Sequence, residues 1–485
     1  MPQHRLVHGV VMGRMNDKLK SHKHNFAVDE TSLRFMLRLA GPMVIATTSF
    51  TLMQFVDRIM VSRLGTAALA AVLPAGFTAA IPAACVMGVF ASVSTFVSQY
   101  FGRGREKECT SYFWQAIYIG LAFSLVVLAI CWPMAPAIFK SFGHAPDVVE
   151  LEVIYFRIML FANVAVVFVW AGTQFFMGIH RPILTMYAAL TAQVVNIIAN
   201  YILIFGKFGF PKMGIAGSAW GTVIGIIVGG GIRLSTFFAG DIRKTFVSRQ
   251  MFRPDFGKMA DLLKVGLPAG VELALSTGVW GAILFWLVGR FGKADQAATS
   301  AAIACTNLSI MPIEGIRIAL SAAVGKSIGA DKDLTAVKQT RLCLRIALIY
   351  MGLVGLSFLL FGRTFMRLWS SDDTVIQTGA AVLVFAAVYQ VFYASRTVYS
   401  GALRGAGDTL WLAAASAIGA VVVLGLGGFV IIKLFPSFGS LGAWAAATLS
   451  IITVGLANRM RFKSNKWKEI NLFGPGAVEL PVGEQ

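Results

Sequence analysis

The sequence contains little charge. Of its 485 residues only 13% are charged and 57% are hydrophobic, whereas about 25% of the residues of a soluble protein are charged. The mean hydropathy is +0.72. This shortage of charge excludes an ordinary soluble domain, and the apolar blocks of about 20 or more residues are long enough to cross a hydrocarbon core of about 30 Å.

The sequence also lacks the usual marks of metal, nucleotide and nucleophile chemistry. Its cysteines are scattered without a C-x-x-C pair, which argues against a zinc site or a disulfide framework. There is no Walker loop, no H-E-x-x-H and no G-x-S-x-G elbow. We therefore expect no cofactor and no enzyme activity, and any transport must draw on an ion gradient instead of ATP bound by this chain.

The net charge of +19 does not indicate nucleic-acid binding. The basic residues lie in short loops beside apolar blocks, where they set membrane topology and contact anionic lipid head groups. Residues 1–30 are polar and basic without an apolar core segment, which predicts a cytoplasmic tail and not a signal peptide.

The apolar blocks predict an all-α membrane protein with twelve transmembrane helices. They are helix-length and lack the alternation of barrel strands. The expected spans are 35–62, 68–99, 112–139, 150–178, 182–206, 214–239, 262–290, 295–327, 340–368, 376–403, 409–434 and 438–461. This pattern predicts five regions, namely a tail (1–30), a six-helix lobe (31–240), a cytoplasmic linker (241–260), a second six-helix lobe (261–462) and a cytoplasmic tail (463–485).

Lys and Arg accumulate in alternate loops. The two tails, the linker and the loops that contain Arg103 and Lys332 fall on one side, and acidic residues such as Asp147 and Asp372 fall on the other. The positive-inside rule then predicts an inner-membrane protein whose two termini are both cytoplasmic.

The two halves repeat one another at a shift of about 227 residues. Pro42 aligns with Pro268 within one residue, Gly88 with Gly315, and Gly178 with Gly405. Because each unit has an even number of spans, the copies are parallel repeats, and a binding cleft is expected between the two bundles.

Intramembrane polar residues predict the site, because a charge at the centre of a span costs about 2.5–3.5 kcal/mol on insertion scales. In the first half Asp57 lies deep in the first span, and Gln193, Asn196 and Asn200 share one face of the fifth. These residues predict an ion-coupling site for H⁺ or Na⁺, with no other metal. The alternative is a hydrogen-bond cluster that serves packing.

In the second half acids and arginines nearly balance. Glu314 and Arg317 are spaced to form an ion pair on one helix face. The expected lining of the substrate cleft comprises Gln54, Glu272, Tyr389, Tyr393 and Arg396. Pro42 and Pro268 are candidate hinges in equivalent helices. A buried ion-pair network is the structural alternative for the charged members.

Several segments carry a resemblance to a known family. They include GPMVIATTSFTLMQFVDRIMVSRLG, SQYFGRG and NIIANYILIFGKFGFPKMGIAGSAWGT in the first half, and VGLPAGVELA, VGKSIGA and SGALRGAGDT in the second. In this order and spacing, over about residues 30–462, the chain resembles the MATE (multidrug and toxic compound extrusion) family. The resemblance implies two six-helix lobes that together form a V, and antiport of organic cations or amphipathic drugs against H⁺ or Na⁺ by alternating access.

The resemblance also implies site residues. Asp57 occupies the place of the family's coupling acid, about fifteen positions after Pro42. The chain departs from the family where Asn200 replaces a second acid of the fifth span, and where Tyr393 and Arg396 stand at the acid and Gln positions of the tenth. A carboxylate sodium site in the second half is therefore incomplete, and coupling is expected in the first.

Two other functions compete with this hypothesis. A flippase for lipid-linked sugars shares the two-bundle plan, but it would line its cleft with several Arg or Lys side chains to hold a pyrophosphate. A membrane enzyme would need a convergent nucleophile or metal cluster. We expect a monomeric multidrug antiporter whose partners are a small cationic or amphipathic substrate, H⁺ or Na⁺ and membrane lipids.

Overall fold

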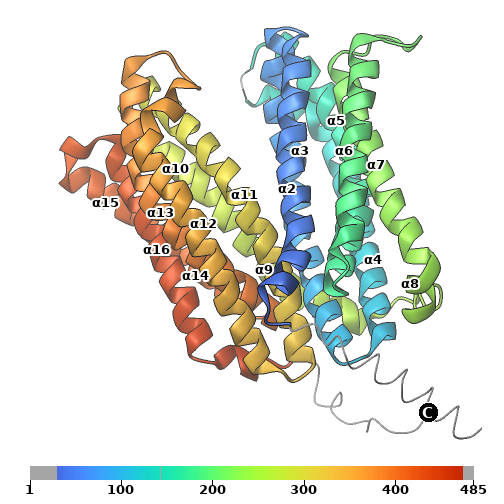
Figure 1. Cartoon of the computed structure of the whole chain (residues 1–485). Coiled ribbons are helices and arrows are strands. Elements are labelled where there is room, and N and C mark those ends of the chain that lie inside the picture. The colour runs from blue at the N-terminus through green and yellow to red at the C-terminus, as the bar shows by residue number, and fades with distance from the viewer. Residues whose placement is uncertain (1–29, 143, 473–485) are drawn as a thin grey trace, which may run out of the picture.

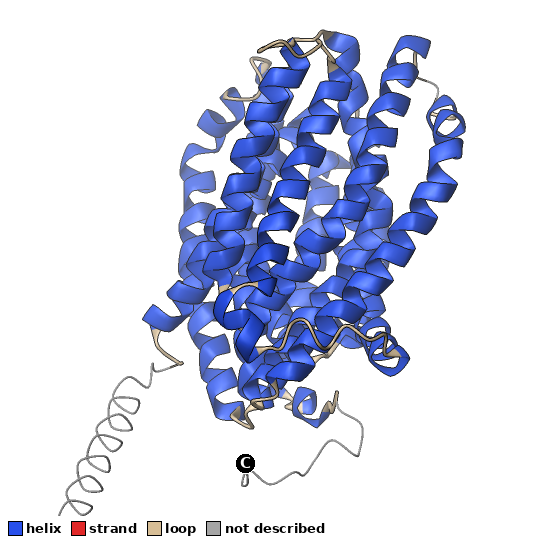
Figure 2. Ribbon diagram, turned by 90° about the vertical axis from the view of Figure 1, so that its right-hand side faces the viewer, coloured by secondary structure: helices blue, strands red, loops and turns tan. Residues whose placement is uncertain are grey.

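The computed structural model describes residues 30–142 and 144–472, and every regular element in them is helical. The helices run side by side with their loops near the two ends (Figure 2). The first half contains α2 (Leu33–Ser62), α3 (Thr66–Gly102), α4 (Glu106–Lys140), α5 (Pro146–Gly178), α6 (Pro182–Phe205), α7 (Ile215–Phe238) and the short α8 (Gly240–Thr245).

The second half repeats this order with more irregular helices. It contains α9 (Phe256–Leu273), α10 (Trp280–Val288), α11 (Lys293–Gly329), α12 (Asp333–Arg367), α13 (Asp373–Ala406), α14 (Thr409–Ala417), α15 (Gly427–Leu434) and α16 (Ser440–Lys463). Two π-helical segments, Ala274–Val279 and Ile418–Leu426, join α9 to α10 and α14 to α15. The sequence did not predict these segments, because their apolar composition suits any helix.

Twelve helical stretches of the described chain match the twelve predicted spans. Eleven are long and apolar enough to cross a membrane, counting Phe256–Phe291 and Thr409–Leu434 as one stretch each. The twelfth is α3, a helix of 37 residues that contains no charged side chain. The predicted all-α membrane fold is thus confirmed.

Side-chain caps begin the equivalent first helices of the two halves. Ser32 accepts a hydrogen bond from the backbone of Phe35 at 3.2 Å, and Asp255 accepts one from Lys258 at 3.1 Å. Each cap satisfies a backbone N–H that has no partner within the helix. Pro42 and Pro268 lie inside these helices, which continue through both.

The segment predicted as a linker, 241–260, contains α8 and the first turn of α9. Its non-helical part lies on the start of α4. The Thr110 hydroxyl donates to the Phe246 carbonyl at 2.6 Å, and the Gln115 side chain both donates to Arg253 and accepts from Asp255. These bonds hold the linker against the first half.

The two halves approach each other at one end of the molecule and diverge towards the other (Figure 1). They meet where α3 packs on α9 and α11, and where α2 packs on α11. Glycines make the contact close. A Cβ on Gly88 would overlap the backbone of Gly266 and Gly270, and one on Gly315 would come within 2.8 Å of the Val44 nitrogen.

Hydrogen bonds between the halves lie in the same region. Thr95 donates to the Arg404 carbonyl at 3.0 Å, and Gln99 donates to the Gly405 carbonyl at 2.9 Å. His180, in the turn between α5 and α6, lies 3.1 Å from the Ala322 carbonyl of α11. Since the carbonyl can only accept, Nε2 of His180 carries the proton. These bonds fasten the two halves together at their converging end.

Candidate functional site

Asp57 lies in the last two turns of α2 and faces α6. Its Oδ1 accepts a hydrogen bond of 2.6 Å from Nδ2 of Asn200. Asn200 is completely buried, whereas Asp57 is half-buried at the edge of a cavity. The fixed amide therefore holds a carboxylate that a small cation can still reach.

A chain of polar groups extends from this contact across α6 to α7. The Oδ1 of Asn196 lies 3.3 Å from Nδ2 of Asn200, and Nδ2 of Asn196 donates to the Thr222 hydroxyl at 3.3 Å. Thr222 in turn donates to the Ser218 carbonyl at 3.1 Å. In the described part of the chain, Oδ1 of Asn200 has no hydrogen-bond partner. This oxygen packs against Gly221 of α7, where a Cβ would lie 1.9 Å from it, so the amide presents its nitrogen and not its oxygen to Asp57.

A glycine makes room for this arrangement. A Cβ on Gly221 of α7 would overlap the side-chain amide of Asn200 and lie 2.9 Å from its backbone nitrogen. The close packing of α6 on α7 at Gly221 is what directs the Asn200 amide towards Asp57.

Asp57 opens onto a cavity of about 480 Å³ bounded by α2, α3, α5, α6 and α7. This volume lies within the range of about 300–1,000 Å³ typical of small-molecule sites. Gln54, Gln193 and Asn196 contribute amides, and most of the remaining lining is apolar. The titratable side chains of the lining are Asp57, Arg58, Tyr155 and Arg233.

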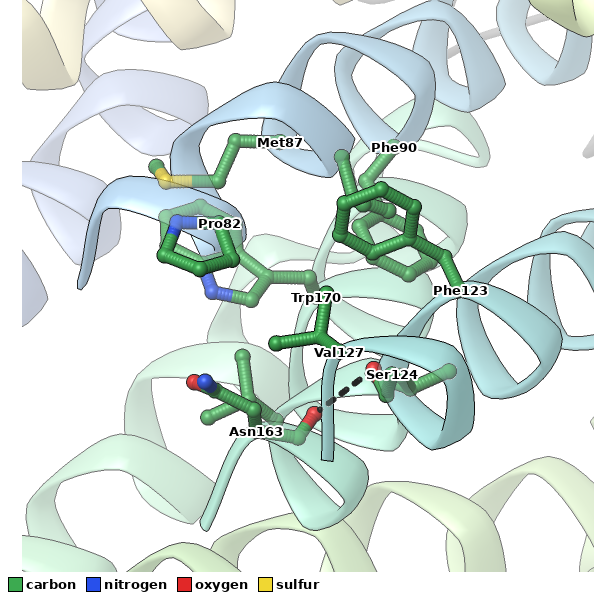
Figure 3. Close-up of a pocket in the computed structure, with 11 residues that line it drawn as sticks. Pro82, Met87, Phe90, Phe123, Ser124, Val127, Asn163 and Trp170 are labelled. Carbon is green, nitrogen blue, oxygen red and sulfur yellow. Dashed lines mark hydrogen bonds between the residues drawn. The ribbon is translucent and has the colours of Figure 1, made fainter. Parts of the chain in front are cut away.

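A small pocket of about 20 Å³ lies behind one wall of this cavity. It is lined by side chains of α3, α4 and α5, and it shares Asn163, Val166 and Trp170 with the larger cavity. Figure 3 shows Ser124 bonded to the Asn163 carbonyl, a distance of 3.3 Å. The Asn163 amide donates to the Ala79 carbonyl at 3.2 Å, so it fixes the wall near Pro82.

A second group of polar side chains lies within the second half. Nε of Arg317 donates to Glu314 at 2.6 Å, and the Tyr393 hydroxyl donates to the other carboxylate oxygen at 3.0 Å. The Arg396 guanidinium lies 5.7 Å from the centre of the Tyr393 ring, and the Tyr389 ring centre lies 5.6 Å from the same point. The carboxylate of Glu314 is thus held by neighbours on two helices.

Glu272 of α9 pairs with Arg404 of α13, and both side chains are at least 90% buried. Arg404 was not among the site residues predicted from the sequence. The signal in the sequence was the position of Arg404, which lies among small residues at the end of the predicted span 376–403. Buried in this way, the pair ties α9 to α13.

The predicted site residues therefore fall into two separate groups. Gln54, Asp57 and Asn196 line the first-half cavity, and Asn200 lies behind Asp57, to which it is hydrogen-bonded. Gln54 had been placed with Glu272, Tyr389, Tyr393 and Arg396, all of which lie in the second half. Arg233 of α7 was overlooked, although an arginine inside the predicted span 214–239 was a visible signal. Within residues 30–142 and 144–472, no group of three His, Cys, Asp or Glu side chains could hold a metal ion.

The MatE family model matches the chain twice, over residues 42–202 and 268–427. This chain belongs to the MatE (MATE) family. The two matches begin at Pro42 and Pro268, in agreement with the internal repeat. MATE proteins are membrane transporters and not enzymes.

Similar proteins include two that are called probable multidrug resistance protein NorM. The one from Geobacillus kaustophilus is 27% identical over 78% of this chain and 83% of its own length. The one from Xanthomonas axonopodis pv. citri is 27% identical over 88% of this chain and 92% of its own length.

Solved structures of MATE transporters share the fold. A MOP superfamily transporter from Pyrococcus furiosus superposes with a TM-score of 0.81 at 21% identity, covering 89% of this chain and 96% of its own. A multidrug resistance MATE family transporter in its outward-facing conformation gives a TM-score of 0.81 at 22% identity, with the same coverage of both chains. The MATE fold thus spans nearly all of the described residues.

Proposed function

We propose that this protein exports small amphipathic or cationic molecules from the cytoplasm in exchange for H⁺ or Na⁺, by alternating access. The proposal depends on Asp57, which lies on the wall of the first-half cavity and is held from behind by Asn200. A single carboxylate in a mostly apolar cavity can hold one cation at a time. Binding of the coupling ion and binding of a cationic substrate can therefore exclude each other at this site, so that arrival of the ion favours release of the substrate.

The electrostatics of the cavity favour coupling in the first half. There the carboxylate of Asp57 has an amide partner and forms no ion pair within the described residues. In the second half Glu272 and Glu314 are each paired with an arginine. A paired carboxylate is already neutralised, so it is the poorer acceptor for a transported cation.

The orientation of the chain follows from its basic loops. The loops that join α3 to α4 and α11 to α12 lie at the end where the halves converge (Figure 1), and they contain Arg103 and Lys332. The positive-inside rule assigns this end to the cytoplasm. The inner membrane would then hold the protein with both termini cytoplasmic. The contacts around Gly88 would close the cytoplasmic side, and the diverging end would face outward.

The flippase alternative is weaker. A pyrophosphate needs several unpaired cationic side chains in one cleft. The first-half cavity offers Arg58 and Arg233 beside the opposing carboxylate of Asp57, and Arg317 and Arg404 of the second half are engaged with Glu314 and Glu272. The similar proteins called NorM are described as multidrug resistance proteins, which favours drug export.

Transport in proteoliposomes tests the proposal. Vesicles that contain the protein are expected to expel ethidium when an inward Na⁺ or H⁺ gradient is imposed. Each gradient is applied separately, so that the experiment identifies the coupling ion. Asp57→Asn keeps the size of the side chain and removes its charge, so it should reduce exchange to the level of empty vesicles. Asp241→Asn, at the exposed carboxylate of α8, is the matched control.

Two outcomes would contradict the proposal. A rate of ethidium transport that is the same with and without each gradient would exclude ion coupling. Full exchange by a well-expressed Asp57→Asn protein would remove Asp57 from the mechanism and direct attention to Glu272 and Glu314.

A further inference from the structure

Arg233 is a buried arginine without a carboxylate partner. Its side chain is 4% exposed, and none of the ion pairs formed by the described residues includes it. One guanidinium nitrogen donates to the Gly229 carbonyl at 2.8 Å and the other to the Thr185 carbonyl at 3.2 Å. The Nε–H has no partner within the described part of the chain.

The fold holds this guanidinium at the cavity wall. Gly172 of α5 leaves space for the aliphatic part of Arg233, since a Cβ there would lie 2.9 Å from Cβ of Arg233. Thr185 of α6 and Gly229 of α7 fix the charged end. Arg233 lines the same cavity as Asp57. An ion buried without a counter-ion is strongly unfavourable, and a bound anion would offset that cost.

The two charged ends of the cavity are well separated. Asn200, the partner of Asp57, packs on Gly221, whereas the guanidinium of Arg233 packs on Gly229. Eight residues of α7 separate these glycines, which corresponds to about 12 Å along the helix. A drug-sized molecule can therefore present one group to Asp57 and another to Arg233.

The balance of charge in the lining supports this arrangement. Asp57 supplies one negative charge, and Arg58 and Arg233 supply two positive charges. A purely cationic substrate would add to this excess, whereas a molecule that also carries an anionic group would neutralise it.

We infer that Arg233 forms an anion subsite of the first-half cavity, so that the preferred substrates are amphipathic zwitterions with a carboxylate or a comparable anionic group. The inference rests on the proposed export function for its biological meaning. The binding site itself is defined by Arg233, Thr185, Gly229 and Gly172 and can be tested without transport. The anionic group lies against the Arg233 guanidinium at the cavity wall, while the cationic part of the molecule lies towards Asp57.

The test uses two dyes of nearly equal shape. Rhodamine B is a zwitterion near neutral pH, and its ethyl ester is a cation. Binding of each dye to the purified full-length protein in detergent is followed by fluorescence anisotropy. The wild type should bind the zwitterion about tenfold more tightly, the size expected for one charge-assisted hydrogen bond.

Arg233→Gln should abolish this preference by weakening only the zwitterion, and Arg233→Lys should retain part of it. Arg290→Gln, which removes an arginine that stacks on Trp286 in the second half, is the control. Equal affinity of the wild type for both dyes would overturn the inference even if the Arg233 variants did not fold. An unchanged preference in a folded Arg233→Gln protein would show that Arg233 serves only to join α6 and α7.

The same proteins in vesicles separate this inference from the proposed function. If the wild type binds the zwitterion preferentially but exchanges neither dye against an ion gradient, the export proposal fails and the subsite stands. If both dyes are exported with equal affinity, the export proposal stands and the subsite is overturned.

Discussion

Asn200 donates a hydrogen bond of 2.6 Å to the carboxylate of Asp57, a residue 143 positions earlier in the chain. The contact joins α6 to α2 inside the first half. Because Asn200 is fully buried, it cannot turn away from Asp57 without disturbing the packing of α6 on α7. The position of the Asp57 carboxylate is therefore determined by a glycine contact between two other helices.

Gly221→Ala should impair ion-coupled exchange without touching Asp57. The new Cβ would overlap the Asn200 amide and force it to shift, which breaks its hydrogen bond to Asp57. We expect the apparent affinity for the coupling ion to fall about tenfold, a loss of about 1.4 kcal/mol. Gly231→Ala in the same helix meets nothing within 4 Å and is the matched control. Equal effects of the two substitutions would contradict this explanation.

Glu272→Gln should strongly destabilise the second half. It would leave Arg404 buried without its counter-ion, a change that typically costs about 3–5 kcal/mol. Thermal unfolding in detergent measures the effect. The double variant Glu272→Gln, Arg404→Gln removes both charges and should recover part of the loss.

An exposed ion pair supplies the control for this experiment. Asp241 and Arg181 form an ion pair at the surface. Asp241→Asn breaks this pair and should leave the unfolding temperature unchanged. A Glu272→Gln protein as stable as the wild type would show that Arg404 finds another partner or reaches water.

Stability should fall in mild acid because of His180. Burial, and secondarily the positive charge of Lys326, lower the pKa of His180 to about 4 from its usual value near 6.5. Lys326 itself pairs with Glu30 at 2.7 Å. Between these two pKa values the unfolded chain binds more protons than the folded one, so stability is complete above about pH 6.5 and declines as the pH falls towards 4.

Thermal unfolding at a series of pH values checks this prediction. The full change is at most about 3 kcal/mol for this one group. His180→Gln can still donate to the Ala322 carbonyl and cannot gain a charge, so its unfolding temperature should depend less on pH. If the unfolding temperature of His180→Gln depends on pH as strongly as that of the wild type, titratable groups other than His180 cause the loss of stability in acid.

Gly88→Ala should favour separation of the two halves at their converging end. The added methyl group would overlap the backbone of α9 at Gly266 and Gly270. Spin labels at the exposed positions Lys107 of α4 and Lys338 of α12 should therefore move apart in distance measurements. Gly352→Ala lies in open space and is the control. Unchanged label distances would show that the helices tolerate the methyl group by a small local shift.

The sequence by itself determined the membrane fold. Long apolar spans separated by basic loops leave few alternatives, because backbone groups in a hydrocarbon core must be paired within a helix. The same reasoning explains why the predicted spans agree closely with the helices from α2 to α16. The repeat was visible because glycine and proline recur at equivalent positions where the fold needs them.

Only the tertiary structure decided which polar residues meet. Asp57 could be recognised as costly in a span, but its contact with Asn200 depends on how α6 packs at Gly221. Glu272 pairs with Arg404 across 132 positions, and Arg233 reaches a cavity through space left by Gly172. Helical periodicity relates residues within one helix, whereas these contacts arise from packing between helices, which no local pattern encodes.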